Sequence, residues 1–257
     1  MARRATAAEL RIAPEFEPVL ASAGLLTVAQ LLEASECVRD LRDRSNHVLR
    51  VGTHVFHVKR RRDVASSAEA ATLRRARAAG VPTPTIAFEG ADPACGAIVG
   101  TVDLAPARPL DALLRAGAMP AASRPRVLAA LALAVARLHD ARLHPRDLYL
   151  NHVFASPYGS PPGVTLIDLE RATGRRWLRR RAVVRDLAAL RASTPDDLVS
   201  AGERRRFLAR YLRARGRDVR AAFASLANAV ERKATSVRAH VPRTPVGDAA
   251  RPRPSRS

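Results

Sequence analysis

The apolar pattern of this chain changes character near residue 104. Between residues 37 and 103, short runs of β-branched and aromatic residues alternate with turn-forming residues, as at 43–46 and 52–53, which is typical of antiparallel strands. From Leu110 onwards, long stretches rich in alanine and leucine carry helical spacing. Strands gathered in one part and helices in the other predict an α+β architecture of two lobes, which suits a chain of 257 residues.

The strand-rich part, residues 35–103, predicts a small lobe. Three short strands fall within residues 37–59, and a helix at 68–79 follows, with Ser66 and Ser67 available as caps and Gly80 at its end. Two further strands at 86–88 and 97–99 complete a five-stranded lobe with one helix after the third strand. Residues 5–33 carry the spacing of one or two short helices broken by Pro14, and we expect residues 1–34 to form an N-terminal helical extension.

The helix-rich part, residues 104–234, predicts the larger lobe. Residues 125–139 are apolar almost all round, so this helix is expected to be buried. A polar loop follows, and then a short apolar run at 164–168 that ends in Asp168. Amphipathic helices are expected at 183–191, 201–215 and 219–232. From residue 235 to 257 proline, arginine and serine dominate, which predicts a disordered tail.

The net charge of +20 predicts an anionic partner. Only Lys59 and Lys233 among the 44 basic residues are lysine, so Lys59, in an apolar strand, suggests a site that needs a compact point charge. Nucleic acid is one candidate partner, supported by the arginine runs and the basic tail. Few aromatic residues and no zinc-finger or basic-zipper motif weigh against it, so it remains the competing class of function.

Four residues stand in an order that suits phosphoryl transfer: Lys59, Glu69, Asp147 and Asp168. A lysine on a strand can hold phosphates, and a helical glutamate can orient it. One carboxylate can accept the proton of an acceptor hydroxyl, while a second can hold a metal ion. Taken singly, three of these residues also have an ordinary explanation: a surface lysine, a solvated glutamate and, for Asp147, a pair with Arg146. Asp168 differs, because a carboxylate that directly follows an apolar strand needs compensation, and a metal ion is a common one. Only their order and spacing indicate a site.

Residues 144–154, HPRDLYLNHVF, and 166–171, LIDLER, resemble the catalytic loop and metal motif of the bacterial lipopolysaccharide kinase family. That family contains the core heptose kinases and belongs to the protein-kinase-like superfamily. Residues 55–60 resemble its nucleotide-lysine strand, 69–84 its glutamate helix and following strand, and 185–190 its bracing helix. The resemblance covers roughly residues 35–215 and implies a two-lobed protein-kinase-like fold with an ATP–Mg²⁺ site between the lobes.

The resemblance also implies a role for each matching residue. Asp147 is expected to be the catalytic base and Asp186 a structural brace of the loop. The nucleotide phosphates would contact Lys59, which Glu69 would orient. The expected metal ligands are Asp168 and a second residue from the loop, with His152 as first choice and Asn151 as second.

Two departures from the usual kinase pattern stand out. Pro145 occupies the position where kinases carry histidine, and His144 precedes it. Residues 41–47, where a glycine-rich phosphate loop is expected, contain no glycine. Two alternatives therefore stay open. One is a catalytically inactive protein of kinase-like fold that binds nucleic acid, and the other is a kinase for another small molecule or a protein.

The acceptor implied by the resemblance is a sugar hydroxyl of a lipid-linked glycan, in particular the lipopolysaccharide core. The arginines of the Arg175–Arg181 region surround Trp177 and could contact an acidic membrane surface. The alternative is a solvated basic face. The sequence contains no stretch of about 20 apolar residues, so we expect a cytoplasmic protein, peripheral to the inner membrane if it binds there.

Overall fold

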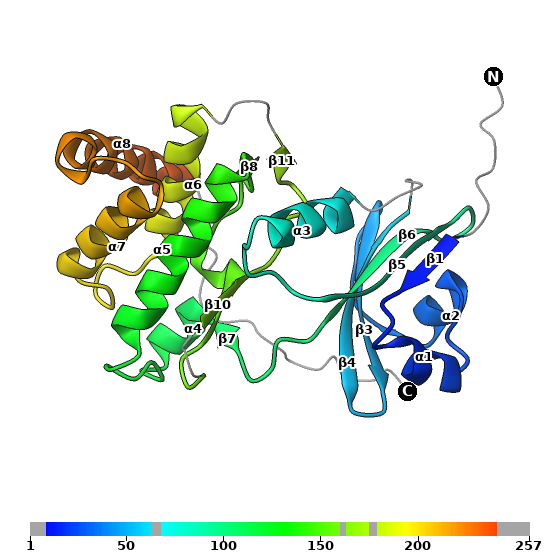
Figure 1. Ribbon diagram of the computed structural model, residues 1–257. Coiled ribbons are helices and arrows are strands. Elements are labelled where there is room, and N and C mark those ends of the chain that lie inside the picture. Colours follow the sequence, from blue (N-terminus) through cyan, green and yellow to red (C-terminus); the bar gives the residue numbers. More distant parts are fainter. Residues whose placement is uncertain (1–8, 63–67, 160–162, 175–178, 241–257) are drawn as a thin grey trace, which may run out of the picture.

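The computed structural model describes residues 9–62, 68–159, 163–174 and 179–240. Figure 1 shows two lobes, an antiparallel sheet on one side and a mainly helical lobe on the other, with one helix between them. The two-lobed, kinase-like α+β fold predicted from the sequence is confirmed.

The N-lobe sheet has six strands rather than the five predicted, in the order β1-β5-β6-β4-β3-β2. Its strands are β1 (Glu9–Ile12), β2 (Glu36–Asp40), β3 (Arg44–Val51), β4 (His54–Arg61), β5 (Ile86–Asp92) and β6 (Gly96–Val102). The extra strand, β1, pairs with β5 at the sheet edge. Four residues are too few for a strand period to be recognised, and this strand forms only because a distant edge is available to pair with it.

Helices α1 (Glu17–Ser22) and α2 (Val28–Glu33) cover one face of this sheet. Their buried residues form one core with the strands, made by Leu20, Leu25, Val28, Leu31, Leu49, Phe56, Val58, Ala87, Phe88 and Ile98. Residues 9–33 of the predicted N-terminal helical extension therefore share the N-lobe core, and they begin with strand β1. Local periodicity showed the helices, but it could not show what their apolar sides would contact.

Helix α3 (Ala68–Ala78) lies on the opposite side of the sheet, between the lobes (Figure 1). Its bounds agree with the predicted 68–79. Ala70, Leu73 and Ala76 are buried, and so is Glu69 in its first turn. The proposed caps Ser66 and Ser67 lie outside the described residues. This placement of α3 directs its single acidic residue toward the sheet rather than toward solvent.

The C-lobe is built around α5 (Arg124–Asp140), which is buried along most of its length, as predicted. The other helices are α4 (Leu110–Arg115), α6 (Arg180–Ser193), α7 (Ala201–Ala214) and α8 (Val219–His240). Two small sheets complete it, β10-β9-β7 and β11-β8, formed by β7 (Arg108–Pro109), β8 (Leu143–His144), β9 (Val153–Ser156), β10 (Gly163–Leu166) and β11 (Thr173–Gly174).

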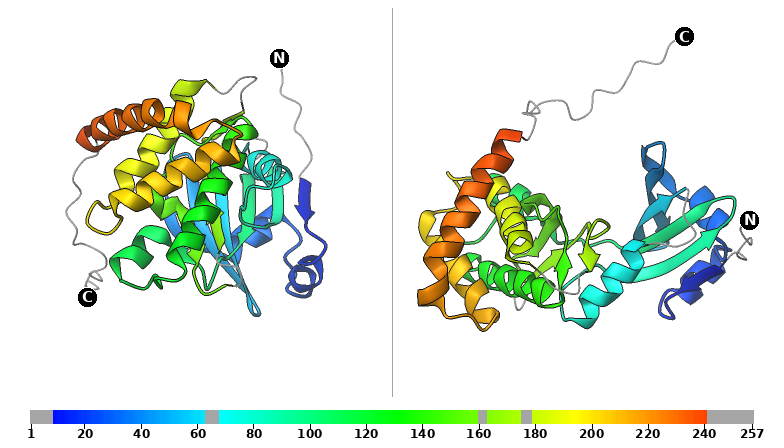
Figure 2. Two further views of the ribbon diagram at one scale, coloured as in Figure 1. Left: turned by 60° about the vertical axis from the view of Figure 1, so that its left-hand side comes forward. Right: turned by 90° about the horizontal axis from the view of Figure 1, so that it is seen from above.

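Helix α8 runs along α6 on the side of the lobe away from the sheet (Figures 1 and 2). It continues to His240, with Val230 and Ala234 buried, so the predicted start of a disordered tail at 235 is corrected. Packing on α6 keeps these residues helical despite their weak apolar pattern. Residues 241–257 lie outside the described part. No helix within the described ranges is both long and apolar enough to span a bilayer.

Candidate active site

Lys59 lies on the sheet face that looks toward α3. Neighbouring positions on a strand point to opposite faces, so Val58 enters the N-lobe core while Lys59 faces the cleft. Its Nζ donates to Glu69 Oε1 at 2.8 Å and to Asp168 Oδ1 at 2.9 Å. The structure thus brings together three residues that the sequence predicted as one site, and it joins the two lobes through them.

The charges of this group support one another. Burial disfavours the ammonium form of Lys59, but the carboxylates of Glu69 and Asp168 outweigh burial and raise its pKa. Burial likewise favours the neutral form of Asp168, yet Lys59 and neighbouring cations hold the pKa of that carboxyl below its usual value. Lys59 and Asp168 are therefore both charged at neutral pH.

Asp168 sits on an unusual backbone. It follows β10 and Ile167, whose N–H donates to the carbonyl of His152 at 3.0 Å. Its φ is 58°, and that of Arg146, in the catalytic loop, is 71°. Left-handed backbone is uncommon for residues other than glycine, and it concentrates where function requires a particular side-chain direction. Both segments that carry a predicted catalytic carboxylate show it.

Asp147 follows Arg146 in a loop anchored by the buried Leu148 and Leu150. Both of its carboxylate oxygens accept hydrogen bonds from Arg171 Nη1, at 2.9 and 3.2 Å. Sequence reasoning missed this partner, although Arg171 lies only three residues after Asp168. The guanidinium orients the carboxylate that we expect to act as base.

His152 ends the short 3₁₀ helix η1 (Leu150–His152). Its Nδ1 donates to the carbonyl of Asp147 at 2.8 Å, which leaves the lone pair of Nε2 available in the neutral ring. That Nε2 lies 3.8 Å from Asp168 Oδ2. Within the described part of the chain, no hydrogen bond or ion pair joins the exposed Asn151 to Asp168. The geometry thus favours His152 over Asn151 as partner of Asp168.

An imidazole nitrogen and a carboxylate oxygen facing each other fit a metal ion that other ligands complete. The described residues contain no group of three or more histidine, cysteine, aspartate or glutamate side chains suited to a metal. Mg²⁺ is usually held by one or two protein carboxylates together with waters and substrate phosphates. Asp168 supplies the carboxylate that such a site requires, and Nε2 of His152 lies beside it.

Asp186, on α6, braces the catalytic loop from behind. It is fully buried and its Oδ1 accepts the backbone N–H of Arg146 at 3.3 Å, as predicted. Its Oδ2 accepts from His144 Nδ1 at 2.7 Å. Although Pro145 replaces the usual kinase histidine, His144 supplies a ring that ties the loop to α6. Burial opposes ionisation of Asp186, but hydrogen bonds from His139 and His144 lower the pKa of its carboxyl.

His139, at the end of α5, is a member of this network that sequence reasoning did not identify. Its Nε2 donates to Asp186 Oδ2 at 3.2 Å, and Tyr211 donates its hydroxyl proton to Nδ1 at 2.8 Å. Burial raises the pKa of Tyr211 to about 12, so this hydroxyl keeps its proton. A neutral His139 satisfies both partners, and burial lowers its pKa.

This network predicts a pH dependence of stability. In the unfolded chain His139 takes up a proton near its ordinary pKa of about 6.5, whereas the folded protein resists protonation. The free energy of unfolding should fall as pH drops from 7.5 to 5.5, by at most about 1.4 kcal/mol per pH unit from this group. Denaturant titration of the wild type and His139→Gln tests it. If the free energy of unfolding changed equally with pH in both proteins, His139 would not be the group responsible.

Glu170 forms a second connection between the lobes. Its Oε1 accepts from Arg61 Nη1 at 2.9 Å, and its Oε2 lies 3.7 Å from Arg44 Nη1. Sequence reasoning missed these three residues because the pairs join strands β3 and β4 to a segment more than a hundred positions away. Most of the predicted membrane contact, from Arg175 to Leu178 and including Trp177, lies outside the described residues.

Comparison with known proteins identifies a family for this chain. The model of the family described as "Lipopolysaccharide kinase (Kdo/WaaP) family" matches residues 34–211. The solved structure "WaaP in complex with acyl carrier protein" aligns with a TM-score of 0.70 and 27% identity, covering 89% of this chain and 99% of that one. The Cydia pomonella granulovirus kinase PK-1 aligns with a TM-score of 0.43 and 14% identity over 59% of each chain. A search of curated proteins found no match.

Proposed function

The chain belongs to the lipopolysaccharide kinase (Kdo/WaaP) family and is a kinase, and from this premise we propose that it transfers the γ-phosphoryl group of ATP to a sugar hydroxyl of the lipopolysaccharide core. The observation that carries the proposal is the convergence of Lys59 with Glu69 and Asp168 across the cleft, at 2.8 and 2.9 Å. A half-buried lysine held by two carboxylates from different lobes is suited to receive nucleotide phosphates.

Each side chain has a distinct task in this proposal. Lys59 binds the phosphates and Glu69 keeps its ammonium group in place. Asp147 accepts the proton of the attacking hydroxyl, while Arg171 holds its carboxylate in position. Asp168 and His152 would hold Mg²⁺, which, when bound, neutralises the charge of the phosphates. Asp186 acts only through the loop that it braces.

A transfer assay tests the proposal directly. The full chain is incubated with ATP labelled on its γ-phosphate, with or without Mg²⁺, and with lipopolysaccharide core lacking phosphate. We expect Mg²⁺-dependent label in the core glycan and, separately, a higher melting temperature with Mg²⁺ and ATP. Label in a different small molecule or a protein would change the acceptor but keep the kinase. Absence of both label and ATP-dependent stabilisation would overturn the proposal and leave nucleic-acid binding as the next test.

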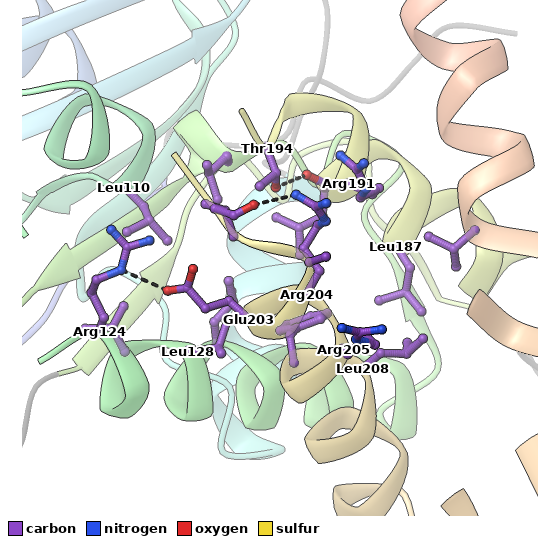
Figure 3. A pocket seen from close by; sticks show the side chains of 18 of the residues that line it. Leu110, Arg124, Leu128, Leu187, Arg191, Thr194, Glu203, Arg204, Arg205 and Leu208 are labelled. Atoms are coloured by element: carbon purple, nitrogen blue, oxygen red, sulfur yellow. Dashed lines mark hydrogen bonds and ion pairs between the residues drawn. The ribbon is translucent and has the colours of Figure 1, made fainter. Parts of the chain in front are cut away.

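A second function concerns a partner protein. The similar structure of WaaP contains an acyl carrier protein, and we propose that this chain also binds one. Support comes from a cavity of about 340 Å³ inside the C-lobe, between α5, α6, α7 and α8. Figure 3 shows leucines from three of these helices around it, together with arginines, and the labelled ones include Leu128, Leu187, Leu208, Arg204 and Arg205.

The chemistry of that cavity matches an acylated carrier. Its size falls within the range of about 300–1,000 Å³ that is usual for small-molecule sites. Leucines can bury a fatty acyl chain, and the arginines can pair with the anionic phosphate of the pantetheine arm that bears it. None of the residues predicted for phosphoryl transfer lines this cavity, so the two functions can be tested separately.

Leu128→Trp is expected to weaken binding of an acylated carrier protein about tenfold. The larger ring would take the room of about two methylenes, each contributing about 0.8 kcal/mol when buried, and 1.4 kcal/mol corresponds to tenfold. Leu133→Trp is the matched control, because Leu133 lies on the same helix but is exposed. Calorimetry with acylated and free-thiol carrier gives both affinities. Equal binding of the two carriers to the wild type would contradict the role of the cavity.

A further inference from the structure

The loop that should cover the nucleotide phosphates has no glycine, and its structure shows why another group is needed. Glycine-rich loops cover phosphates closely because a backbone without Cβ can approach them. Here β2 and β3 are joined by a tight turn between Leu41 and Arg44. The N–H of Leu41 donates to the carbonyl of Arg44 at 2.9 Å, and the N–H of Arg44 to that of Leu41 at 3.4 Å. These two donors are used within the turn.

Side chains replace the missing backbone donors on the same face of the sheet. Register pairs Arg39 with Asn46 and Asn46 with Lys59, and residues paired across antiparallel strands lie on one face. Arg44 is two positions from Asn46, so it shares that face. Arg39, Arg44, Asn46 and Lys59 line one small cavity of about 90 Å³ together with Asp168 and Glu170. The side chains of Arg39 and Arg44 therefore add positive charge to the cleft next to Lys59.

Of these two arginines, Arg44 is the better placed to bind a phosphate group. It lies in the cleft beside Asp168, whose carboxylate form its charge helps to stabilise. It also lines the larger neighbouring cavity of about 360 Å³ with Lys59, Glu69 and Arg171. Its Nη1 lies 3.7 Å from the carboxylate of Glu170, so an anionic group already occupies the direction in which the guanidinium points.

We propose that Arg44 is a phosphate-binding residue of the nucleotide site, replacing the glycine-rich loop with a guanidinium that leaves Glu170 for the nucleotide. The inference rests on the proposed function, because it assumes that ATP binds beside Lys59. A guanidinium can donate two parallel hydrogen bonds to a phosphate. Its effect must therefore depend on the phosphates and not on the base or the ribose.

The experiment compares the affinities of ATP with Mg²⁺, ADP with Mg²⁺ and adenosine for the full chain by calorimetry. Arg44→Gln should weaken ATP binding about tenfold or more and leave adenosine binding within about twofold. Arg50→Gln is the matched control, because Arg50 lies on the same strand and is exposed. Glu170→Gln releases both Arg44 and Arg61 from their carboxylate, so its effect on ATP binding should disappear when Arg44 is also changed to Gln.

The outcomes distinguish a failure of the proposed role of Arg44 from a failure of the proposed kinase function. If the wild type binds ATP and Arg44→Gln binds it as well as Arg50→Gln does, the inference is overturned and the kinase remains. An equal loss for adenosine and ATP would also overturn it, since the variant would then act through the fold of the lobe. A wild type that binds no nucleotide would overturn the proposed function, and this inference with it.

Discussion

Asp147→Asn is expected to lower kcat for phosphoryl transfer by about 10²–10⁴, the usual contribution of a positioned general base. The amide keeps the size of the side chain but cannot accept the hydroxyl proton. The carboxylate lies at the cleft, held on both oxygens by Arg171, and the loop around it is anchored through Arg146 and Asp186. The variant should therefore fold normally and still bind ATP with Mg²⁺.

Initial rates of label transfer and nucleotide-dependent melting measure these two effects separately. Asp197→Asn is the control, an exposed aspartate of the same lobe. A kcat within about threefold of the wild type would contradict a role as base, because such a loss is far below the range expected. Loss of ATP binding together with kcat would instead assign Asp147 to the nucleotide site.

Asp168→Asn should have the largest effect, with transfer reduced more than about a thousandfold. A metal ion contributes several kcal/mol to stabilising the charge of the transition state, and each 1.36 kcal/mol is about tenfold in rate. Asparagine at this position offers a neutral ligand beside His152. Lys59 keeps its other partner, Glu69, at 2.8 Å, so the variant should lose the metal rather than the fold.

The direct measurement is stabilisation by ATP with and without Mg²⁺. At a concentration of about a hundred times Kd, a ligand that binds only the native state raises its stability by about 2.7 kcal/mol. We expect the Mg²⁺-dependent part of that gain to be present in the wild type and absent from Asp168→Asn, while Asp197→Asn behaves as wild type. A Mg²⁺-dependent gain of equal size in Asp168→Asn would exclude Asp168 as a metal ligand.

The high positive charge has a more specific meaning in the structure than in the composition. Several arginines are tied to neighbouring carboxylates, including Arg124 with Glu203 and Arg215 with Asp140. In the cleft, one cavity is lined by Lys59 together with Arg44, Arg60, Arg61 and Arg171. Most of these arginines are also paired with a carboxylate, either Glu170 or Asp147. We therefore expect the anionic partner that the net charge predicts to bind beside the residues proposed to perform transfer.

The sequence by itself determined the secondary structure that builds each lobe. Strands β3 and β4, helix α3 and helices α5 to α7 lie close to the predicted ranges, because alternating and helical apolar spacing are local properties of the chain. The resemblance of residues 144–154 and 166–171 to its motifs identified the family, and this membership was confirmed. It also predicted the contact between Lys59 and Glu69, which lie only ten residues apart in the sequence, on β4 and α3.

Only the tertiary structure decided which distant groups meet. The pairing of β1 with the sheet edge, the bonds from Lys59 to Asp168 and from Arg171 to Asp147, and the place of His139 beside Asp186 all join separate segments. Such contacts have no signature in local spacing, since the side chains that make them are ordinary until folding removes water and brings a partner near. The left-handed backbone of Asp168 has the same origin, because the packing around it must hold a conformation that the residue alone would avoid.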